Sequence, residues 1–477
     1  MTTDTVVRAV KFRIDPKALS KEQSDLMDRC AGASRAFWNW GLDIWNQQDR
    51  AVNDVFAERI KDLSDEEKEA ARKDKSLWKE IRETVRILEV DGKMVRVDAF
   101  SLDKAHSRQA ADPEHYLHWY KAEKHGIPSR VVKESIRNLG ESVTRYMKGQ
   151  VNKGKSSKPR KDGRPDGWPR FKSRYDDKAF VRPALNFDMP KKKTLIESSS
   201  RIYIPSIGSL RVGGGTKRLK NLINVGGIAK TARFTCKGGY WYVSISVTVP
   251  VQNVKMPTQD DMNRLKNNGV VGVDLGVKTL ATLSNGSIVE NPRHGRKNKA
   301  RVDGLRRKVS AATKGSENRK KAVKHLSKVS HRNDLRKKTF LHGVTKDWTT
   351  TYESICIEDL NVSGMTSKVA PKIDPNDPTK YLPNGAAAKS GLNREILDIG
   401  FYELRRQLEY KSLLYGSNVQ VIDRFFPSSK TCSKCGQIKS DLKLSDREYV
   451  CDCGLTIDRD LNAAINIKKY FYPELTH

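Results

Sequence analysis

Three acidic residues stand at the ends of predicted secondary-structure elements, where their carboxylates could share one metal site. Residues 270–273 and 354–357 read as buried strands, and these strands end in Asp274 and Glu358. Asp460 lies at the start of a predicted helix. An acid in such a place costs free energy unless it is paired, hydrogen-bonded or bound to metal. Alone, Asp274 is more typical of a turn or a cap, but the three acids together favour a shared site.

A pocket holding three carboxylates would need divalent cations, because the like charges otherwise repel one another. Hard oxygen ligands favour Mg²⁺ or Mn²⁺. Two such ions about 4 Å apart can activate a water molecule and stabilise the leaving oxygen of a phosphodiester. The acids therefore predict a catalytic site for phosphodiester hydrolysis.

Four cysteines near the C-terminus predict a zinc site. Cys432 and Cys435 form a C-x-x-C pair, Cys451 and Cys453 form a C-x-C pair, and 15 residues separate the two pairs. Thiolate pairs at this spacing, each followed by a turn glycine, are typical of a structural, tetrahedral zinc ribbon. The C-x-C pair predicts a strained knuckle with unequal ligation, and four reduced thiols beside a loop are the alternative. The other three cysteines are isolated and read as small core residues, as expected in a reducing cytosol.

The net charge of the chain points to a polyanionic partner. Among 477 residues, Lys and Arg number 90 and Asp and Glu number 57, which gives a net charge of +33. Nucleic acid is the first candidate for such a protein, and a merely soluble basic protein is the alternative. Hydrophobic residues make up 37%, enough for packed cores in two to four domains. No run approaches membrane-spanning length and no apolar signal sequence is evident, so we expect no membrane partner.

Two segments concentrate residues suited to nucleic acid. Residues 291–350 hold 19 Lys/Arg and 4 Asp/Glu, a net charge of +15, with apolar residues at helical spacing. We expect two long antiparallel helices with a turn near Gly315, either neutralised by phosphates or simply solvated. Residues 167–174 interleave aromatic and basic side chains, which fits a nucleic-acid-contacting loop and a bare linker about equally. The predicted contact residues are Arg170, Lys172, Arg174, Arg306, Arg307, Arg319, Lys320, Lys321, Arg336 and Lys337.

The first half of the chain predicts a β-domain interrupted by helices. Residues 6–14 and several short segments between 202 and 249 alternate as strands, which indicates a small antiparallel barrel or sandwich. Residues 20–160 are mostly helical and would be an insertion. Residues 37–45 place Phe and Trp on one helical face, which is more typical of a helix–helix core than of base stacking.

The second half predicts a sheet around the strand of Asp274. The Asn285-Gly286 turn favours a strand that returns antiparallel beside it. Residues 365–390 read as a mobile loop, residues 393–415 as one helix and residues 418–423 as a further strand.

Three short motifs carry a resemblance to a known family. They are VGVDLGVK at 271–278, IEDLN at 357–361 and DRDLNAA at 458–464. They resemble the three split RuvC motifs of the TnpB family of transposon-encoded proteins and of the related miniature type V CRISPR effectors. The cysteine pairs lie between the second and third motifs, as in that family. Asp460, two residues before Asn462, matches the position of the motif's acid, and the neighbouring Asp458 is the alternative.

The resemblance implies a multidomain α+β protein. It implies an antiparallel β-barrel wedge domain at 1–20 and 165–260 and a helical recognition lobe at 21–164. It further implies an RNase H-like (RuvC) α/β nuclease domain at 261–426 and 455–477, with a zinc ribbon inserted at 427–454. In this arrangement Asp274, Glu358 and Asp460 are the Mg²⁺ ligands and Cys432, Cys435, Cys451 and Cys453 are the Zn²⁺ ligands.

The activity implied by the resemblance is RNA-guided cleavage of double-stranded DNA next to a short adjacent motif. Guide RNA and target DNA would be the partners of a cytoplasmic bacterial or archaeal protein, either monomeric or homodimeric. Two alternatives are an RNA-guided DNA-binding repressor that does not cleave and a guide-independent zinc-ribbon transposition accessory protein. The presence of all three acids argues against both alternatives.

Overall fold

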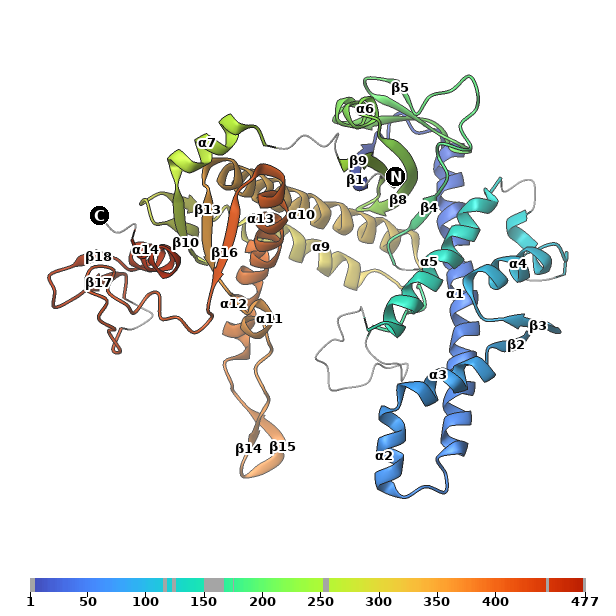
Figure 1. The fold of residues 1–477 in the computed structure, drawn as a ribbon, viewed down its shortest axis with the longest axis horizontal. Helices are drawn as coiled ribbons and strands as arrows, with labels where there is room; N and C mark the ends of the chain where they lie inside the picture. Colours follow the sequence, from blue (N-terminus) through green and yellow to red (C-terminus); the bar gives the residue numbers. More distant parts are fainter. Residues whose placement is uncertain are drawn as a thin grey trace. The chain divides into compact units, whose positions relative to one another are not determined.

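A computed structural model of the chain describes residues 5–114, 118–121, 126–149, 167–174, 176–251, 257–442 and 446–474. It divides into two compact units, Met1–Val254 and Lys255–His477. Each unit has its own sheet and its own apolar core (Figure 1).

The first unit is built on a seven-stranded antiparallel sheet. Its strand order is β4-β8-β9-β1-β7-β6-β5. The strands are β1 (Thr5–Ile14), β4 (Ala179–Arg182), β5 (Ile196–Ser198), β6 (Arg201–Ile204), β7 (Gly208–Gly213), β8 (Ile228–Lys237) and β9 (Tyr240–Pro250). The expected place of residues 6–14 in the β-domain is confirmed, because β1 pairs with β9 from Thr5↔Pro250 to Arg13↔Tyr242.

The expected closed barrel is not found in the described strands. The pairing order has two ends, β4 and β5, and these edge strands are four and three residues long. Such short strands offer few backbone groups for closing a sheet. The described strands therefore form an open sheet.

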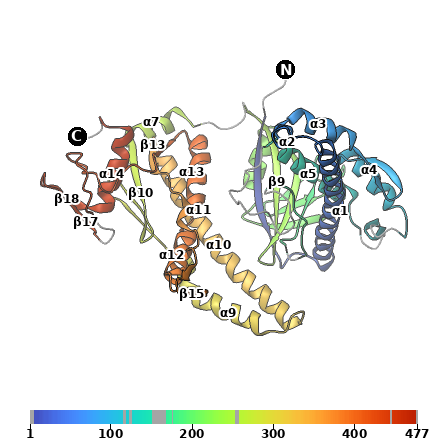
Figure 2. The ribbon, with the colours of Figure 1, turned by 90° about the horizontal axis from the view of Figure 1, so that it is seen from below.

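Helices cover the sheet of the first unit, with a short hairpin between them. The elements are α1 (Lys21–Arg59), α2 (Asp65–Lys73), α3 (Lys75–Thr84), β2 (Ile87–Val90), β3 (Lys93–Arg96), α4 (Ala99–Gln109), η1 (His118–Lys121), α5 (Ser129–Met147) and α6 (Lys217–Asn224). Helix α1 begins at a capping box, in which Ser20 and Gln23 satisfy each other's backbone N–H groups. Figure 2 shows α1 and α5 beside the sheet around β9, where Met27, Cys30 and Val131 join the sheet's core.

The aromatic face of α1 is confirmed as core. Phe37 is fully buried, and Trp40 and Trp45 are 8% and 6% exposed. They pack with residues of α4 and α5 in a second apolar cluster. The hairpin β2–β3 contradicts the expectation of a mostly helical insertion at that point, and its Asp91-Gly92 turn, with both φ angles positive, was the sequence signal for it.

The second unit is built on a five-stranded mixed sheet. Its order is β12-β11-β10-β13-β16, with β10, β13 and β16 parallel and β11 and β12 antiparallel. The strands are β10 (Val270–Leu275), β11 (Thr279–Leu283), β12 (Ile288–Glu290), β13 (Ser354–Glu358) and β16 (Asn418–Ile422). The antiparallel return beside the strand of Asp274 is thus confirmed.

Helices lie on both faces of this sheet. On one face α14 (Arg459–Phe471) packs against β10, β11, β13 and β16. On the other face α10 (Glu317–Thr351) and α13 (Phe401–Tyr415) contribute Leu341, Trp348 and Leu404 to the core. The remaining elements are α7 (Gln259–Asn268), α8 (His294–Lys297), α9 (Lys299–Ala311), α11 (Val362–Met365), β14 (Lys372–Asp374), β15 (Asp377–Leu382), α12 (Ala386–Ile399), β17 (Glu448–Val450) and β18 (Thr456–Asp458).

Three expectations for this unit have clear outcomes. The basic helical hairpin is confirmed as α9 and α10, which contact each other around Gly315. The single helix at 393–415 is wrong, because Gly400 adopts a left-handed φ of 80° and separates α12 from α13. The loop at 365–390 is also wrong, since it contains the hairpin β14–β15 and the start of α12.

Candidate functional site

Two of the three acids are brought together by strand pairing. Strand β10 runs parallel to β13 with Val273 opposite Ile357, so the next residues, Asp274 and Glu358, leave the same edge of the sheet. This is the carboxyl edge of the parallel strands, where open α/β sheets place their ligands.

The third acid, Asp460, lies in α14, and this helix packs unusually close to β10. A Cβ atom on Gly272 would lie 2.1 Å from the backbone oxygen of Ala464, so only glycine allows this approach. Asp458 caps the helix by accepting hydrogen bonds from the N–H groups of Asp460 and Leu461 at 2.9 and 3.0 Å. Asp458 is therefore occupied at the helix end, whereas Asp460 lines the pocket that Asp274 and Glu358 also line.

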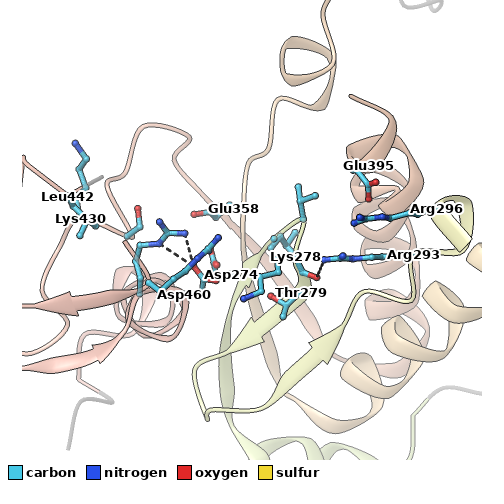
Figure 3. A pocket seen from close by; sticks show the side chains of 16 residues that line it. Asp274, Lys278, Thr279, Arg293, Arg296, Glu358, Glu395, Lys430, Leu442 and Asp460 are labelled. Carbon is cyan, nitrogen blue, oxygen red and sulfur yellow. Dashed lines mark hydrogen bonds and ion pairs between the residues drawn. The ribbon is translucent and has the colours of Figure 1, made fainter. Parts of the chain in front are cut away.

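The three carboxylates open into a pocket of about 570 Å³ in the second unit (Figure 3). Burial, followed by the charges of Glu358 and Asp460, raises the pKa of Asp274 well above its ordinary value. Burial also raises the pKa of Glu358, against a hydrogen bond of 2.8 Å from the Ser428 hydroxyl. Burial thus disfavours the charged form of both acids, and at Asp274 the charges of the other two acids add to this effect.

The donor set suits a hard divalent cation. Carboxylate oxygens are the ligands that Mg²⁺ and Mn²⁺ prefer, and a cation would stabilise the charged form of these buried acids. Among the residues that the structure describes, only the four cysteines bring all their ligand atoms within 4.8 Å of one another. The carboxylate oxygens of the three acids are not all within that distance of one another.

Cations also line the pocket, and the sequence reasoning missed them. The Arg459 guanidinium donates to Asp460 Oδ1 at 3.1 and 3.3 Å. Lys278, Arg293 and Arg296 stand on another wall, where Arg293 donates to the Lys278 carbonyl oxygen at 3.3 Å (Figure 3). The signal for Arg459 was its place inside DRDLNAA, between two acids.

The four cysteines converge as expected. Their Sγ atoms lie within 4.8 Å of one another, with Cys432–Cys453 and Cys435–Cys451 at 3.6 Å. Tetrahedral zinc with Zn–S bonds of about 2.3 Å places sulfur atoms about 3.8 Å apart. The group therefore fits one zinc ion, and the C-x-C spacing does not keep either of its thiols away. Burial by itself would raise the pKa of Cys432, but the N–H groups of Cys435 and Lys434 lower it to about 7.

Helix α14 ties the cysteine cluster to the acid pocket. Asn462 donates to the carbonyl oxygen of Thr431 at 2.7 Å and accepts from the N–H of Ser433 at 2.9 Å. Asn466 donates to the carbonyl oxygen of Ser428 at 2.8 Å, and the Ser428 hydroxyl donates to Glu358. Both asparagines are at most 4% exposed. Their presence in and beside the third motif was the one sequence signal for this role.

The basic residues predicted for nucleic acid in the second unit lie along α9 and α10. Some of them also form hydrogen bonds that stabilise the fold. Arg319 donates to the Ala312 carbonyl oxygen at 3.1 Å across the turn between the helices, and Lys337 donates to the Leu397 carbonyl oxygen at 2.8 Å. The others are Arg306, Arg307, Lys320, Lys321 and Arg336, of which Arg306 and Lys320 form exposed ion pairs within their own helices.

The predicted contact segment in the first unit, residues 167–174, lies against α1. The Trp168 indole donates to Asn46 at 2.9 Å, and the Lys172 N–H donates to Asn39 at 2.7 Å. The Lys172 ammonium lies 3.6 Å from the centre of the Trp38 ring, and burial followed by the nearby charge of Arg233 lowers its pKa to about 8. The segment thus has a structural role, and its two exposed cations are Arg170 and Arg174.

Comparisons with known proteins match the residue ranges that contain the three acids. Family models match residues 401–467 ("Cas12f1-like, TNB domain"), 244–369 ("Probable transposase") and 1–50 ("Helix-turn-helix domain"). The last title does not describe the structure, in which residues 5–50 form β1 and part of one continuous helix.

Two relatives are similar over long stretches. A "Putative RNA-guided DNA endonuclease" of Streptomyces pristinaespiralis is 37% identical over 231 residues, which are 48% of this chain and 50% of that protein. InsQ of Escherichia coli K12, with the same description, is 30% identical over 341 residues, 71% of this chain and 74% of InsQ. The chain thus spans about half the length of the first relative and about three quarters of the second.

Among solved structures, a Cas12f1–sgRNA–target DNA complex aligns over 97% of this chain and 99% of that chain. The sequence identity is 12% and the TM-score is 0.42. Within the described part of the chain, no helix has the length and apolarity that a membrane span requires.

Proposed function

Because the chain belongs to the TnpB family, we propose that it is an RNA-guided DNA endonuclease that cleaves double-stranded DNA next to a short adjacent motif. The observation that carries the proposal is the convergence of Asp274, Glu358 and Asp460 on one pocket from three separate elements. The sheet order, with three consecutive antiparallel strands followed by two parallel ones, supports an RNase H-like nuclease domain.

The three acids have distinct supports in the proposed mechanism. Asp274 and Glu358 are fixed by paired strands, and Asp460 is fixed by a helix whose close approach needs Gly272. They would hold the divalent cations, which supply Lewis-acid stabilisation and an activated water when bound. Ser428 orients the Glu358 carboxylate through its hydrogen bond.

Three further cations of the acid pocket would bind the DNA backbone. Lys278, Arg293 and Arg296 line the same pocket as the acids, so a strand whose phosphate reached the acids would have neighbouring phosphates within reach of these groups. Arg459 holds the Asp460 carboxylate and must release it, wholly or in part, when a cation binds there.

The zinc ribbon would be structural in this proposal. Four thiolates fill a tetrahedral site, and α14 links the ribbon to Glu358 through Asn466 and Ser428. The remaining expectations, a wedge domain and a recognition lobe in the first unit and guide RNA bound to the basic surfaces, are part of the same proposal.

The test is cleavage by the full-length protein purified with its guide RNA. Asp274→Ala should abolish cleavage in Mg²⁺ while leaving guide and target binding unchanged, because the acid lines the pocket and supports no other element. Asp260→Asn, an exposed acid at the start of α7, is the matched control and should cut normally.

The outcomes separate the three functions. Undiminished cutting by Asp274→Ala would place the active site elsewhere. Target binding without any cutting by the wild type would favour a repressor, and the absence of a discrete co-purified RNA would favour a guide-independent accessory protein.

A further inference from the structure

A second pocket of about 400 Å³ adjoins the acid pocket in the second unit. The two pockets share Leu275 and Glu358 as walls, so the second one opens directly beside one of the three acids. Its floor is apolar and includes Ile357, Leu360 and Phe401. Its size falls in the range typical of small-ligand sites.

The three arginines that line this second pocket are already paired with acids in or beside it. Arg405 binds Asp359 at 2.6 Å and Glu409 at 3.0 Å, and Arg424 also binds Asp359. Arg406 binds Glu403 at 2.8 Å, and this hydrogen bond lowers the pKa of Glu403 to about 2. Each of the three arginines therefore has an acid partner, and Glu358 is a further acid of this pocket.

The acid pocket differs in this respect. No ion pair is recorded in the described part of the chain for the cations of its far wall, Lys278, Arg293 and Arg296. Unpaired cations attract phosphates, whereas paired guanidinium groups beside an apolar floor leave flat surfaces for an uncharged ring. The two pockets are thus suited to different parts of one nucleotide.

An exposed aromatic residue lines the second pocket. Tyr402 is 72% exposed, although its neighbour Phe401 is only 3% exposed. The turn at Gly400 starts α13 at this place, so that Phe401 enters the core and Tyr402 points away from it. Phe425, which directly follows the pocket residue Arg424, is 88% exposed. Large aromatic rings this exposed beside arginines are typical of single-stranded nucleic-acid sites.

We propose that this second pocket is a base subsite, in which the base of a nucleotide next to the scissile phosphate of a single DNA strand stacks on Tyr402. The inference rests on the proposed nuclease function. It adds the place where the strand that is cleaved would bind. The phosphate backbone then passes along Lys278, Arg293 and Arg296, while the neighbouring base occupies the pocket behind Glu358.

The test combines a protein change with a DNA change. Tyr402→Ala and Tyr402→Phe are compared with wild type, with Tyr381→Ala as a matched control, because Tyr381 is 69% exposed on β15 of the same unit. Each variant, with its guide RNA, cuts a target series that carries one abasic site at each position flanking the cut. Cleavage is measured under single-turnover conditions at limiting DNA and over a Mg²⁺ titration.

The subsite predicts a specific pattern. Tyr402→Ala should cut intact DNA about 5- to 150-fold more slowly, the range expected when one base loses a stacking partner, with an unchanged Mg²⁺ dependence. Tyr402→Phe and Tyr381→Ala should resemble wild type. At one position, the abasic site should slow wild type by a similar factor and should slow Tyr402→Ala no further.

Two results would overturn the subsite. One is a normal rate for Tyr402→Ala, and the other is additive effects of Tyr402→Ala and the abasic site at every position. If wild type with its guide does not cut at all, the proposed function fails. The subsite can then still be tested by measuring how tightly the Asp274→Ala protein, with and without Tyr402→Ala, binds intact DNA and each abasic DNA.

Discussion

The contact between Gly272 and α14 gives a sharp test of how the third acid is positioned. A Cβ atom at residue 272 would lie 2.1 Å from the Ala464 carbonyl oxygen and 2.6 Å from the Lys468 nitrogen, both of them backbone atoms. To restore ordinary contact, α14 must move away from β10 by about 1 Å, and such a displacement of a catalytic group costs on the order of 100-fold in rate. Overpacking of this kind also destabilises by about 1 to 3 kcal/mol.

We therefore expect Gly272→Ala to fold with a lower melting temperature, to bind guide RNA and target, and to cut at roughly 1% of the wild-type rate. The assay is single-turnover cleavage well below the melting temperature, with thermal unfolding measured on the same sample. Gly343→Ala is the matched control, since a Cβ atom there meets nothing within 4 Å in the middle of α10. Cleavage by Gly272→Ala within twofold of wild type would refute the claim that α14 sets the position of Asp460.

Two further predictions concern the cysteine cluster and a buried lysine. Cys435→Ser should lower bound zinc from about one ion per chain towards none and should lower the melting temperature. The control, Cys236→Ser, should keep the ion. The four-thiol site would be contradicted if elemental analysis found one zinc ion in folded Cys435→Ser protein. Lys411 is 6% exposed and donates to the His342 carbonyl oxygen and the Thr345 hydroxyl, each at 2.8 Å, and burial followed by the charge of Lys346 lowers its pKa from 10.5 to about 8. Because the unfolded chain then binds more protons between pH 8 and 10.5, this group makes the protein more stable as pH rises, by about 1 kcal/mol from pH 7 to 9. Denaturant unfolding should show this gain in wild type relative to Lys411→Met, and parallel pH profiles for the two proteins would disprove it.

The acids and thiols could be predicted because their surroundings are local in sequence. Asp274 and Glu358 each end an apolar run, and a short apolar run predicts a buried strand whatever its neighbours are. The cysteine spacings carry similar local information. The parallel pairing that places Asp274 beside Glu358 was not predicted, since no feature of either strand specifies the other.

The errors arose where tertiary packing overrides local pattern. Residues 393–415 have helical spacing throughout, and only the left-handed conformation of Gly400 divides them into α12 and α13. Leu397 lies four residues before the core residue Phe401 and would share its face in one continuous helix, but it is 55% exposed because Gly400 divides the two helices. Closure of the first sheet would require hydrogen bonds between its two edge strands. The sequences of these strands do not indicate whether they pair.

The position of the cysteine cluster links the proposed zinc site to the proposed catalytic pocket. Asn462 and Asn466 are buried side chains that bind backbone groups of residues 428–433, so the ribbon and the helix that carries Asp460 form one hydrogen-bonded unit. Ser428 extends this unit to Glu358. Leaving a buried amide group without its hydrogen-bond partner costs about 1 to 3 kcal/mol of stability. Loosening the ribbon would therefore weaken the positions of Asp460 on α14 and of Glu358 beside Ser428 together. Loss of zinc should therefore reduce cleavage before it unfolds the sheet, which is held by the separate core around Val271, Ile355 and Leu404.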